Sequence, residues 1–360
     1  VLPYHKQPDI ELLQTSLSKT ILYGVPKIAF NTGKCTPLYA CMESMLHYIG
    51  QYEHASYAYL ASAGAGTFRL CFNAGKWDMS NPDISNMTPQ DRWLPYRRAY
   101  RAAGWHCTIT EKKDTDKAGF FSTITSSIDQ GIPVITVGIV GPEAAIVTGY
   151  NRQGAHLYGF SFFQDMPEFT ADVSIDTTGY FITDTWWETA AAVITLKEKV
   201  PATSIKDTLQ LIYDTLTANA KGTYRTGQKA YESWAADLAD DRFFASNTIT
   251  PVLLQRLFCQ ADAETMVGEG RYWGAAFFTQ LGIENPALST LCNQAATLLT
   301  KTAQCAMEMT AVRHGESATE DAVHYLCYID IRQRLIKLIR QAKDYERQAS
   351  TVIQKIIQLY

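Results

Sequence analysis

The sequence lacks any hydrophobic run long enough to cross a bilayer. The longest apolar stretches, such as residues 134–140, are far shorter than the roughly 20 residues that a transmembrane helix needs. It also lacks a recognisable secretory signal and any run of lysine and arginine interleaved with aromatic residues, which would indicate nucleic-acid binding. The 32 basic and 36 acidic residues give a net charge of only −4. We therefore expect a cytoplasmic protein that binds neither membranes nor nucleic acid.

The cysteines form no CxxC pair and no spacing that is typical of a zinc site. We therefore expect no metal and no cofactor. Scattered cysteines in a chain of this length are typical of a reduced protein in which most thiols are buried as small hydrophobic groups. There are eight: Cys35, Cys41, Cys71, Cys107, Cys259, Cys292, Cys305 and Cys327.

Proline becomes scarce after Pro201, and the pattern changes there from mixed to helical. We predict an α+β domain over residues 1–200 and a helical bundle over 201–360, with a linker at 199–204 and Thr203 or Ser204 as the next helix N-cap. An apolar stripe at helical spacing, formed by Leu209, Ile212, Tyr213 and Leu216, indicates a helix that buries one face in a bundle. The last helix either contributes a homodimer contact or forms a solvated outer face.

The pattern of apolar residues, glycines and prolines also predicts individual elements. In the first half the predicted helices are 8–19, 36–49, 54–62, 90–103 and 117–130. The predicted strands are 67–72, 105–110, 133–139, 144–151, 155–162, 179–184 and 192–197. In the second half the predicted helices are 204–219, 223–240, 250–263, 268–281, 285–312 and 318–358.

Cys35 is the candidate nucleophile because it directly precedes a predicted helix. Pro37 suits the first helical turn, which makes Thr36 the N-cap and leaves Cys35 just outside the helix. The unpaired N–H groups and the positive end of the helix dipole stabilise a thiolate there, and Lys34 would act in the same direction. The same N–H groups can stabilise an oxyanion on a substrate carbonyl. Cys41, one turn into the helix on its apolar face, is expected to be a core residue.

Four segments, taken in order, resemble one known fold. They are Cys35 before the helix that ends at Gly50, the strand that begins Ile132-Pro-Val, the strand Ala145–Tyr150, and Tyr180-Phe-Ile-Thr-Asp184-Thr-Trp. Together they resemble the papain-like fold of bacteriocin-processing peptidase domains. The resemblance is closer to the N-terminal domain of the butirosin biosynthesis protein H family, which joins such a domain to a helical region. The resemblance covers about residues 25–200.

The resemblance implies a cysteine hydrolase or acyltransferase with helices packed on an antiparallel sheet. In the family a cysteine opens the helix, a histidine opens the strand that ends in Gly-Tyr, and an aspartate or asparagine follows the next main strand. These positions map to Cys35, Glu143 and Asp184. The departure is Glu143, which stands where the family has histidine, and none of the seven histidines occupies that position.

Three interpretations of Glu143 remain open. As a general base, it would need burial to raise its pKa, and beside Asp184 one of the two carboxyls would hold a proton. As a ligand-binding residue, it would act with Asp184 on a small cationic or polar molecule after chemistry has been lost. As a turn residue after Gly141-Pro142, it would point to solvent.

The candidates for substrate binding are Asn31, Arg69, Trp77 and Trp186. Arg69 either anchors an acid group of the substrate or pairs with Glu43, and the tryptophans either pack in the core or form an apolar wall. We predict cysteine-dependent acyl transfer or amide hydrolysis on a small molecule, with an acyl donor that is small or carrier-bound. The alternative is an inactive ligand-binding or assembly protein on the same fold.

Overall fold

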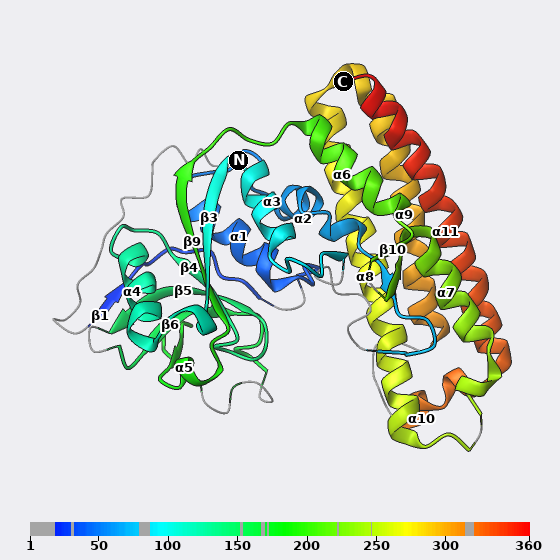
Figure 1. The fold of residues 1–360 in the computed structure, drawn as a ribbon, viewed down its shortest axis with the longest axis horizontal. Helices are drawn as coiled ribbons and strands as arrows, with labels where there is room; N and C mark the ends of the chain where they lie inside the picture. The colour runs from blue at the N-terminus through cyan, green and yellow to red at the C-terminus, as the bar shows by residue number, and fades with distance from the viewer. Residues whose placement is uncertain are drawn as a thin grey trace. The chain divides into compact units, whose positions relative to one another are not determined.

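The computed structural model describes residues 19–29, 32–78, 87–151, 154–166, 170, 173–221, 223–245, 247–313 and 320–360. The chain divides into two compact units (Figure 1). The sheet unit comprises Val1–Leu60 and Tyr100–Ala202, and the helical unit comprises Ala61–Ala99 and Thr203–Tyr360. The second boundary lies two residues from the predicted one at 200/201. Residues 61–99, which the sequence analysis assigned to the first domain, instead group with the helical unit.

The sheet unit contains an antiparallel sheet of 8 strands in the order β3-β9-β4-β5-β6-β8-β7, with β1 also pairing with β5. The strands are β1 (Lys19–Ile21), β3 (Trp105–Glu111), β4 (Val134–Val137), β5 (Ala144–Asn151), β6 (Leu157–Ser161), β7 (Ser174–Ile175), β8 (Phe181–Thr183) and β9 (Ala192–Lys199). The predicted α+β architecture is confirmed: an antiparallel sheet with packed helices precedes a helical region.

Two helices cover opposite sides of this sheet (Figure 1). Helix α1 (Pro37–Tyr48) packs against β4 and β5, and α4 (Lys117–Ile128) packs against β9, β5 and β4. Helix α1 begins as predicted, with Thr36 in an extended N-cap conformation and Pro37 in the first turn. Ten of its residues are buried, so burial of apolar surface stabilises α1 against the sheet. A short helix, α5 (Trp186–Thr189), lies between β8 and β9.

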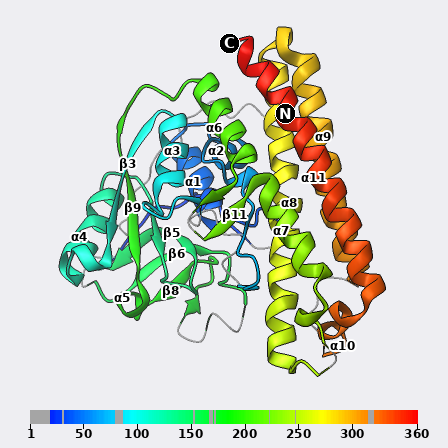
Figure 2. The same ribbon diagram turned by 45° about the vertical axis from the view of Figure 1, so that its right-hand side comes forward.

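The helical unit is built from long helices (Figure 2). They are α6 (Ile205–Thr217), α7 (Gly227–Ala239), α8 (Thr250–Glu284), α9 (Ser289–Val312) and α11 (Ile329–Gln358), with the short α10 (Glu320–Val323). Helix α9 packs along both α8 and α11. Ser204 is the N-cap of α6, and its Oγ accepts a hydrogen bond from the Asp207 N–H at 3.1 Å.

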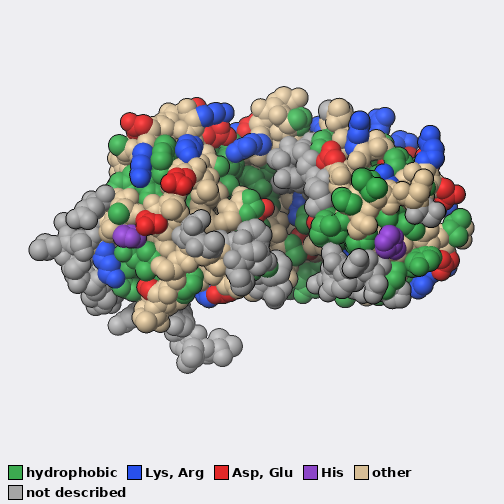
Figure 3. Space-filling view, turned by 90° about the horizontal axis from the view of Figure 1, so that it is seen from below, with side chains coloured by type: hydrophobic (Ala, Val, Ile, Leu, Met, Phe, Trp, Pro, Cys, Tyr) green, Lys and Arg blue, Asp and Glu red, His purple; other side chains and the backbone are tan. Residues whose placement is uncertain are grey.

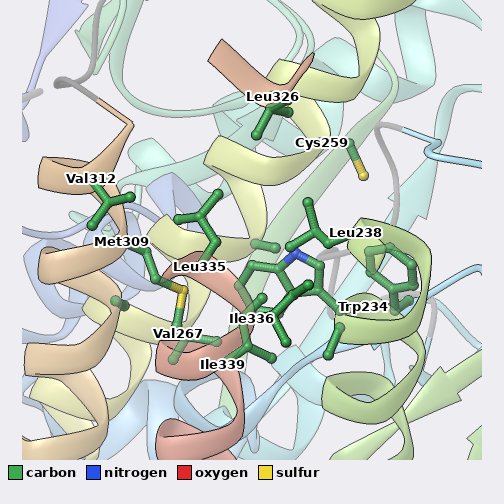
Figure 4. Close-up of a cluster of buried hydrophobic side chains, with 14 of the residues drawn as sticks. Trp234, Leu238, Cys259, Val267, Met309, Val312, Leu326, Leu335, Ile336 and Ile339 are labelled. Carbon is green, nitrogen blue, oxygen red and sulfur yellow. The ribbon is translucent and has the colours of Figure 1, made fainter. Parts of the chain in front are cut away.

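The core of the helical unit combines aliphatic residues with buried aromatic side chains, among them Trp234 (Figure 4). Trp234 of α7 is 0% exposed and lies among side chains from α8, α9 and α11, which include Val267, Met309 and Leu335. Its Nε1 donates a hydrogen bond of 2.7 Å to Gln260 Oε1, so the indole leaves no polar atom unsatisfied.

Residues 61–99 join the helical unit through strand pairing and helix contacts. Strand β2 (Cys71–Phe72) pairs with β11 (Tyr224–Thr226), which pairs with β10 (Ala220–Lys221). The predicted strand 67–72 is therefore mostly wrong, because only its last two residues form a strand and its first two belong to the 3-10 helix η1 (Gly66–Phe68), which packs on α8. The chain passes from one unit to the other within α2 (Tyr57–Ala63) and α3 (Leu94–Ala102).

Helix α8 is a single helix, although the sequence analysis predicted two with a break at 264–267. The glycines that follow this position are Gly268 and Gly270. A Cβ at Gly270 would lie 2.5 Å from the Thr67 carbonyl oxygen, so this glycine lets η1 approach the helix backbone. The glycine therefore reflects a close tertiary contact and not the end of a helix.

Candidate functional site

Cys35 lies immediately before helix α1, and its side chain is exposed. No side chain caps the first turn of α1, which contains no acidic residue. The start of a helix without a side-chain cap carries N–H groups and the positive end of the helix dipole, which favour a developing negative charge. The position therefore suits a thiol that reacts as a thiolate.

The other cysteines are poorer nucleophiles because they are covered. Six of them are buried and Cys327 is half-buried. Burial raises the pKa of Cys41, Cys292 and Cys327, and burial followed by the nearby Glu308 raises the pKa of Cys305 to about 11. Cys41, at 0% exposure, is the core residue that the sequence predicted.

Lys34 does not act on Cys35 as expected. Its ammonium forms an ion pair with Glu43 of α1, and their side chains are 26% and 16% exposed. A neighbouring carboxylate cancels most of the field of an ammonium, so Lys34 contributes little to a thiolate at position 35. The expected pairing of Arg69 with Glu43 is also wrong, because Glu43 is occupied by Lys34.

Glu143 lies in the turn that joins β4 to β5, and its side chain is exposed. Its carbonyl accepts a hydrogen bond of 3.0 Å from the Gly138 N–H, which closes the turn. Asp184 is also exposed and directly follows β8.

The register of the sheet separates these two carboxylates. Thr183 of β8 pairs with Leu157 of β6, which pairs with Tyr150 near the end of β5. Asp184 therefore lies at the end of the sheet where β5 finishes, whereas Glu143 lies where β5 begins. Six residue steps separate Ala144 from Tyr150, which corresponds to about 20 Å along the strand. The prediction that Glu143 and Asp184 act in one centre is therefore wrong.

The chain that leads to α1 is attached to the end of the sheet that carries Glu143. Lys27 pairs with Asp165 at 3.5 Å, and Asp165 follows β6 by four residues. The last residue of β6 pairs with Ala145, two residues after Glu143. In turn, the Ser44 hydroxyl in α1 donates a hydrogen bond of 2.5 Å to the Pro26 carbonyl. These contacts place the segment before α1, and Ser44 within α1, toward the end of the sheet where β5 begins.

His156 lies at the other end. It follows the β5–β6 connection and precedes Leu157, so it is next in register to Asp184. Its Nδ1 lies 2.8 Å from the Asn151 side-chain amide, which fixes the ring at the hairpin. His156 and Glu143 therefore lie at opposite ends of β5 and do not face one site.

The predicted substrate-binding residues do not form one site. Trp77 is 2% exposed and packs edge-to-face against Phe72 and Phe244 in the core of the helical unit. Trp186 is 0% exposed, and its Nε1 donates to the Gly154 carbonyl at 3.2 Å. Both are core residues, because a fully covered indole has no surface to offer a substrate. Asn31 lies outside the described residues.

Arg69 is also interior to the helical unit. Its side chain is 5% exposed, its guanidinium donates to Gly66 O and lies 3.9 Å from Glu269 Oε2. The carboxylate partner of this arginine is thus part of the protein, and the expectation that Arg69 anchors an acid group of a substrate is not supported. The sequence indicated that Arg69 needs a charged partner, but a local pattern could not predict Glu269, which lies 200 residues further along the chain.

The sequence analysis assigned no role to a buried polar network in the helical unit. Arg271, at 0% exposure, donates to Glu346 Oε2 at 2.6 Å and to the Arg69 carbonyl at 2.7 Å. The Tyr231 hydroxyl donates to the same Glu346 oxygen at 2.9 Å, and burial followed by that carboxylate raises the pKa of Tyr231. This network joins α7, α8 and α11 to η1 and is structural.

Comparison with known proteins identifies no family for this chain. No model of a known protein family matches the chain, and no curated protein sequence is similar to it. Among the described residues, no three His, Cys, Asp or Glu side chains are grouped to hold a metal ion, and no helix is long and apolar enough to cross a membrane. On the face seen in Figure 3, acidic and basic side chains of the described residues are intermixed.

Proposed function

We propose that the sheet unit is a papain-like domain that catalyses cysteine-dependent acyl transfer or amide hydrolysis on a small molecule, with Cys35 as the nucleophile. The observation that carries this proposal is the exposed Cys35 at the start of α1, a helix packed on an antiparallel sheet. The seven other cysteines are buried or half-buried, so no other thiol competes for this role.

The chemistry follows from that position. The Cys35 sulfur attacks the carbonyl carbon of the acyl donor, and N–H groups at the start of α1 stabilise the resulting oxyanion. The thiol proton passes to Glu143, which takes the place of the usual histidine, and from there to the leaving amine or thiol. Water or an amine acceptor then attacks the thioester, which releases the acid or the amide and restores the thiol. The donor is a small acyl compound or a carrier-bound thioester.

A second candidate function is a ligand-binding protein that has lost this chemistry. It is favoured by one specific observation: Asp184, the expected third residue, lies about 20 Å along the sheet from Glu143. An exposed carboxylate that lies this far from Asp184 is not oriented by it, so the usual arrangement of base and orienting acid is not formed by these two residues.

Trapping of an acyl-enzyme separates the two functions. The protein is mixed with the N-acetylcysteamine thioester of acetate or butyrate, and its intact mass is followed with time. Acyl transfer predicts a mass increase equal to one acyl group, localised to Cys35 and abolished in Cys35→Ala, while the matched control Cys327→Ala keeps it. Glu143→Gln should slow acylation at least tenfold. Absence of any adduct on Cys35 with both thioesters would contradict the enzymatic proposal and favour the binding function.

A further inference from the structure

The two chain neighbours of Cys35 are attached to two side chains that are bonded to each other. On one side, the Lys34 ammonium is paired with Glu43 of α1. On the other, the Thr36 N–H donates to the Tyr57 hydroxyl at 3.1 Å. The two partners are joined to each other, because the Tyr57 N–H donates to Glu43 Oε1 at 2.9 Å. One connected group therefore holds the backbone N–H of Thr36 on one side of Cys35 and the side-chain ammonium of Lys34 on the other.

The group is built into the fold and is not a surface ion pair. Glu43 is the one acidic residue of α1, whose other residues are apolar or neutral except for His47. Its side chain is 16% exposed, and Tyr57 is 1% exposed. A carboxylate that is mostly buried needs hydrogen bonds and an opposite charge, because its removal from water is otherwise costly. The Lys34 ammonium also lies 5.8 Å from the centre of the Tyr57 ring.

We propose that Glu43 and Tyr57 are positioning residues for Cys35, which hold its backbone at the start of α1 and cancel the charge of Lys34 beside the thiol. A positioning role for these residues rests on the proposed function, whereas their contacts are observed independently of it. Because Glu43 cancels the charge of Lys34, the electrostatic potential at the thiol is set by the N–H groups and the dipole at the start of α1. This potential stays constant as long as the Lys34–Glu43 pair is intact.

Other titratable groups around this pair are His47 and Tyr39. His47 follows Glu43 by one turn of α1, and burial, partly offset by Glu43 and reinforced by Lys34, lowers its pKa. It is therefore neutral across the pH range in which a thiol ionises. Tyr39 packs edge-to-face on Tyr57, with ring centres 6.3 Å apart.

The proposal predicts opposite effects for the two members of the ion pair. Alkylation of Cys35 by iodoacetamide is followed from pH 6 to 10, with tandem mass spectrometry to distinguish Cys35 from the other thiols. In Glu43→Gln the uncompensated ammonium shifts the midpoint of the rate profile to lower pH by about half to one unit. In Lys34→Gln the uncompensated carboxylate shifts it to higher pH by a similar amount. The double variant K34Q/E43Q returns the midpoint to near the wild-type value.

Tyr57→Phe is the matched variant that changes no charge. It removes the acceptor for the Thr36 N–H, so the midpoint stays close to that of the wild type while amide hydrogen exchange at Thr36 becomes at least tenfold faster. Far-UV circular dichroism verifies that each variant is folded. If E43Q fails to fold, the effect of charge is tested with K34Q alone, because Lys34 is partly exposed and its substitution leaves no new cavity in the core. Superimposable profiles for K34Q, E43Q and wild type would overturn the proposal. The pH profile of alkylation measures the ionisation of the thiol, whereas thioester trapping measures its acyl chemistry, so either proposal can fail without the other.

Discussion

The glycines of α8 offer the sharpest test of how the helical unit is held together. A Cβ at Gly270 would lie 2.5 Å from the carbonyl oxygen and 3.1 Å from the carbonyl carbon of Thr67. Both are backbone atoms, so no side-chain rotation relieves the contact. The nearby Arg271 bonds to the carbonyls of Phe68 and Arg69, so a shift of η1 would lengthen those hydrogen bonds as well.

Gly268 is the matched control because it lies in the same helix two residues earlier. A Cβ there would meet only Ala306 Cβ, at 3.4 Å. Helix propensity alone favours alanine over glycine by about 0.5–1 kcal/mol at either position. Gly268→Ala should therefore raise the free energy of unfolding by about that amount. Gly270→Ala should lower it by about 1–3 kcal/mol, because overpacking outweighs propensity.

The two variants should differ in melting temperature by roughly 4–15 °C, from a difference of about 2–4 kcal/mol in a unit of this size. Far-UV circular dichroism during thermal and urea unfolding measures this difference, since α8 and its neighbours contribute most of the helical signal. Equal stabilisation by both substitutions would refute the reasoning, because it would mean that η1 does not approach Gly270 closely.

Three further substitutions test other parts of the structure. Glu346→Leu should lower the free energy of unfolding by about 3–5 kcal/mol, because it leaves the buried Arg271 charge without its carboxylate partner. Urea unfolding should show that the double variant R271M/E346L loses less free energy of unfolding than the two single variants combined. Ser204→Ala should cost about 1 kcal/mol through loss of the α6 N-cap, measured in the same way, with no effect on Cys35 alkylation. Burial raises the pKa of Asp262 to about 6, so the folded state binds this proton more tightly than the unfolded chain and stability falls as the pH rises from about 4 to 6. Asp262→Asn should therefore stabilise the protein by about 1–3 kcal/mol at pH 7 and have no effect below pH 4, which melting temperatures at the two pH values would measure.

Each of these expectations has a result that contradicts it. For Glu346, a loss below 1 kcal/mol would show that Arg271 finds other partners. For Asp262, equal stabilisation at pH 4 and pH 7 would show that the effect comes from packing and not from ionisation. For Ser204, an unchanged free energy would show that water satisfies the first N–H groups of α6 equally well.

Local chemistry was sufficient to predict elements whose ends have sequence signals. Thr36 and Pro37 mark the start of α1, and Ser204 marks the start of α6, as the structure confirms. The apolar runs on either side of Gly141-Pro142 likewise predict β4 and β5. In each case the determining contacts lie within a few residues in sequence.

The predictions failed where a distant partner decides the structure. The break predicted at 264–267 is absent, and the nearby Gly270 serves a close contact with Thr67. Arg69 suggests a ligand site until Glu269 is placed beside it. Trp77 follows a predicted strand but packs against Phe244, far along the chain. Residues 61–99 join the helical unit through such pairings, which no local pattern reveals.

The placement of Asp184 illustrates a rule that applies to any antiparallel sheet. Neighbouring strands run in opposite directions, so a residue after β6 returns to the end where β5 began, and a residue after β8 lies at the far end. A partner for Glu143 must therefore follow a strand that runs against β5 or precede one that runs with it.

Two further segments meet this condition on the other side of Glu143. Val137 pairs with both Ala144 and Ala192, which brings the start of β9 level with the start of β5. The end of β3 is level with them, because Glu111 pairs with Ala192. Lys112 follows, and its Nζ donates to the Glu188 carbonyl at 2.9 Å. Charged groups for a site around Glu143 are therefore to be sought at the end of β3 and the start of β9. Under the proposed acyl transfer, substitutions at this end of the sheet should alter the acylation of Cys35, whereas Asp184→Asn should leave it unchanged.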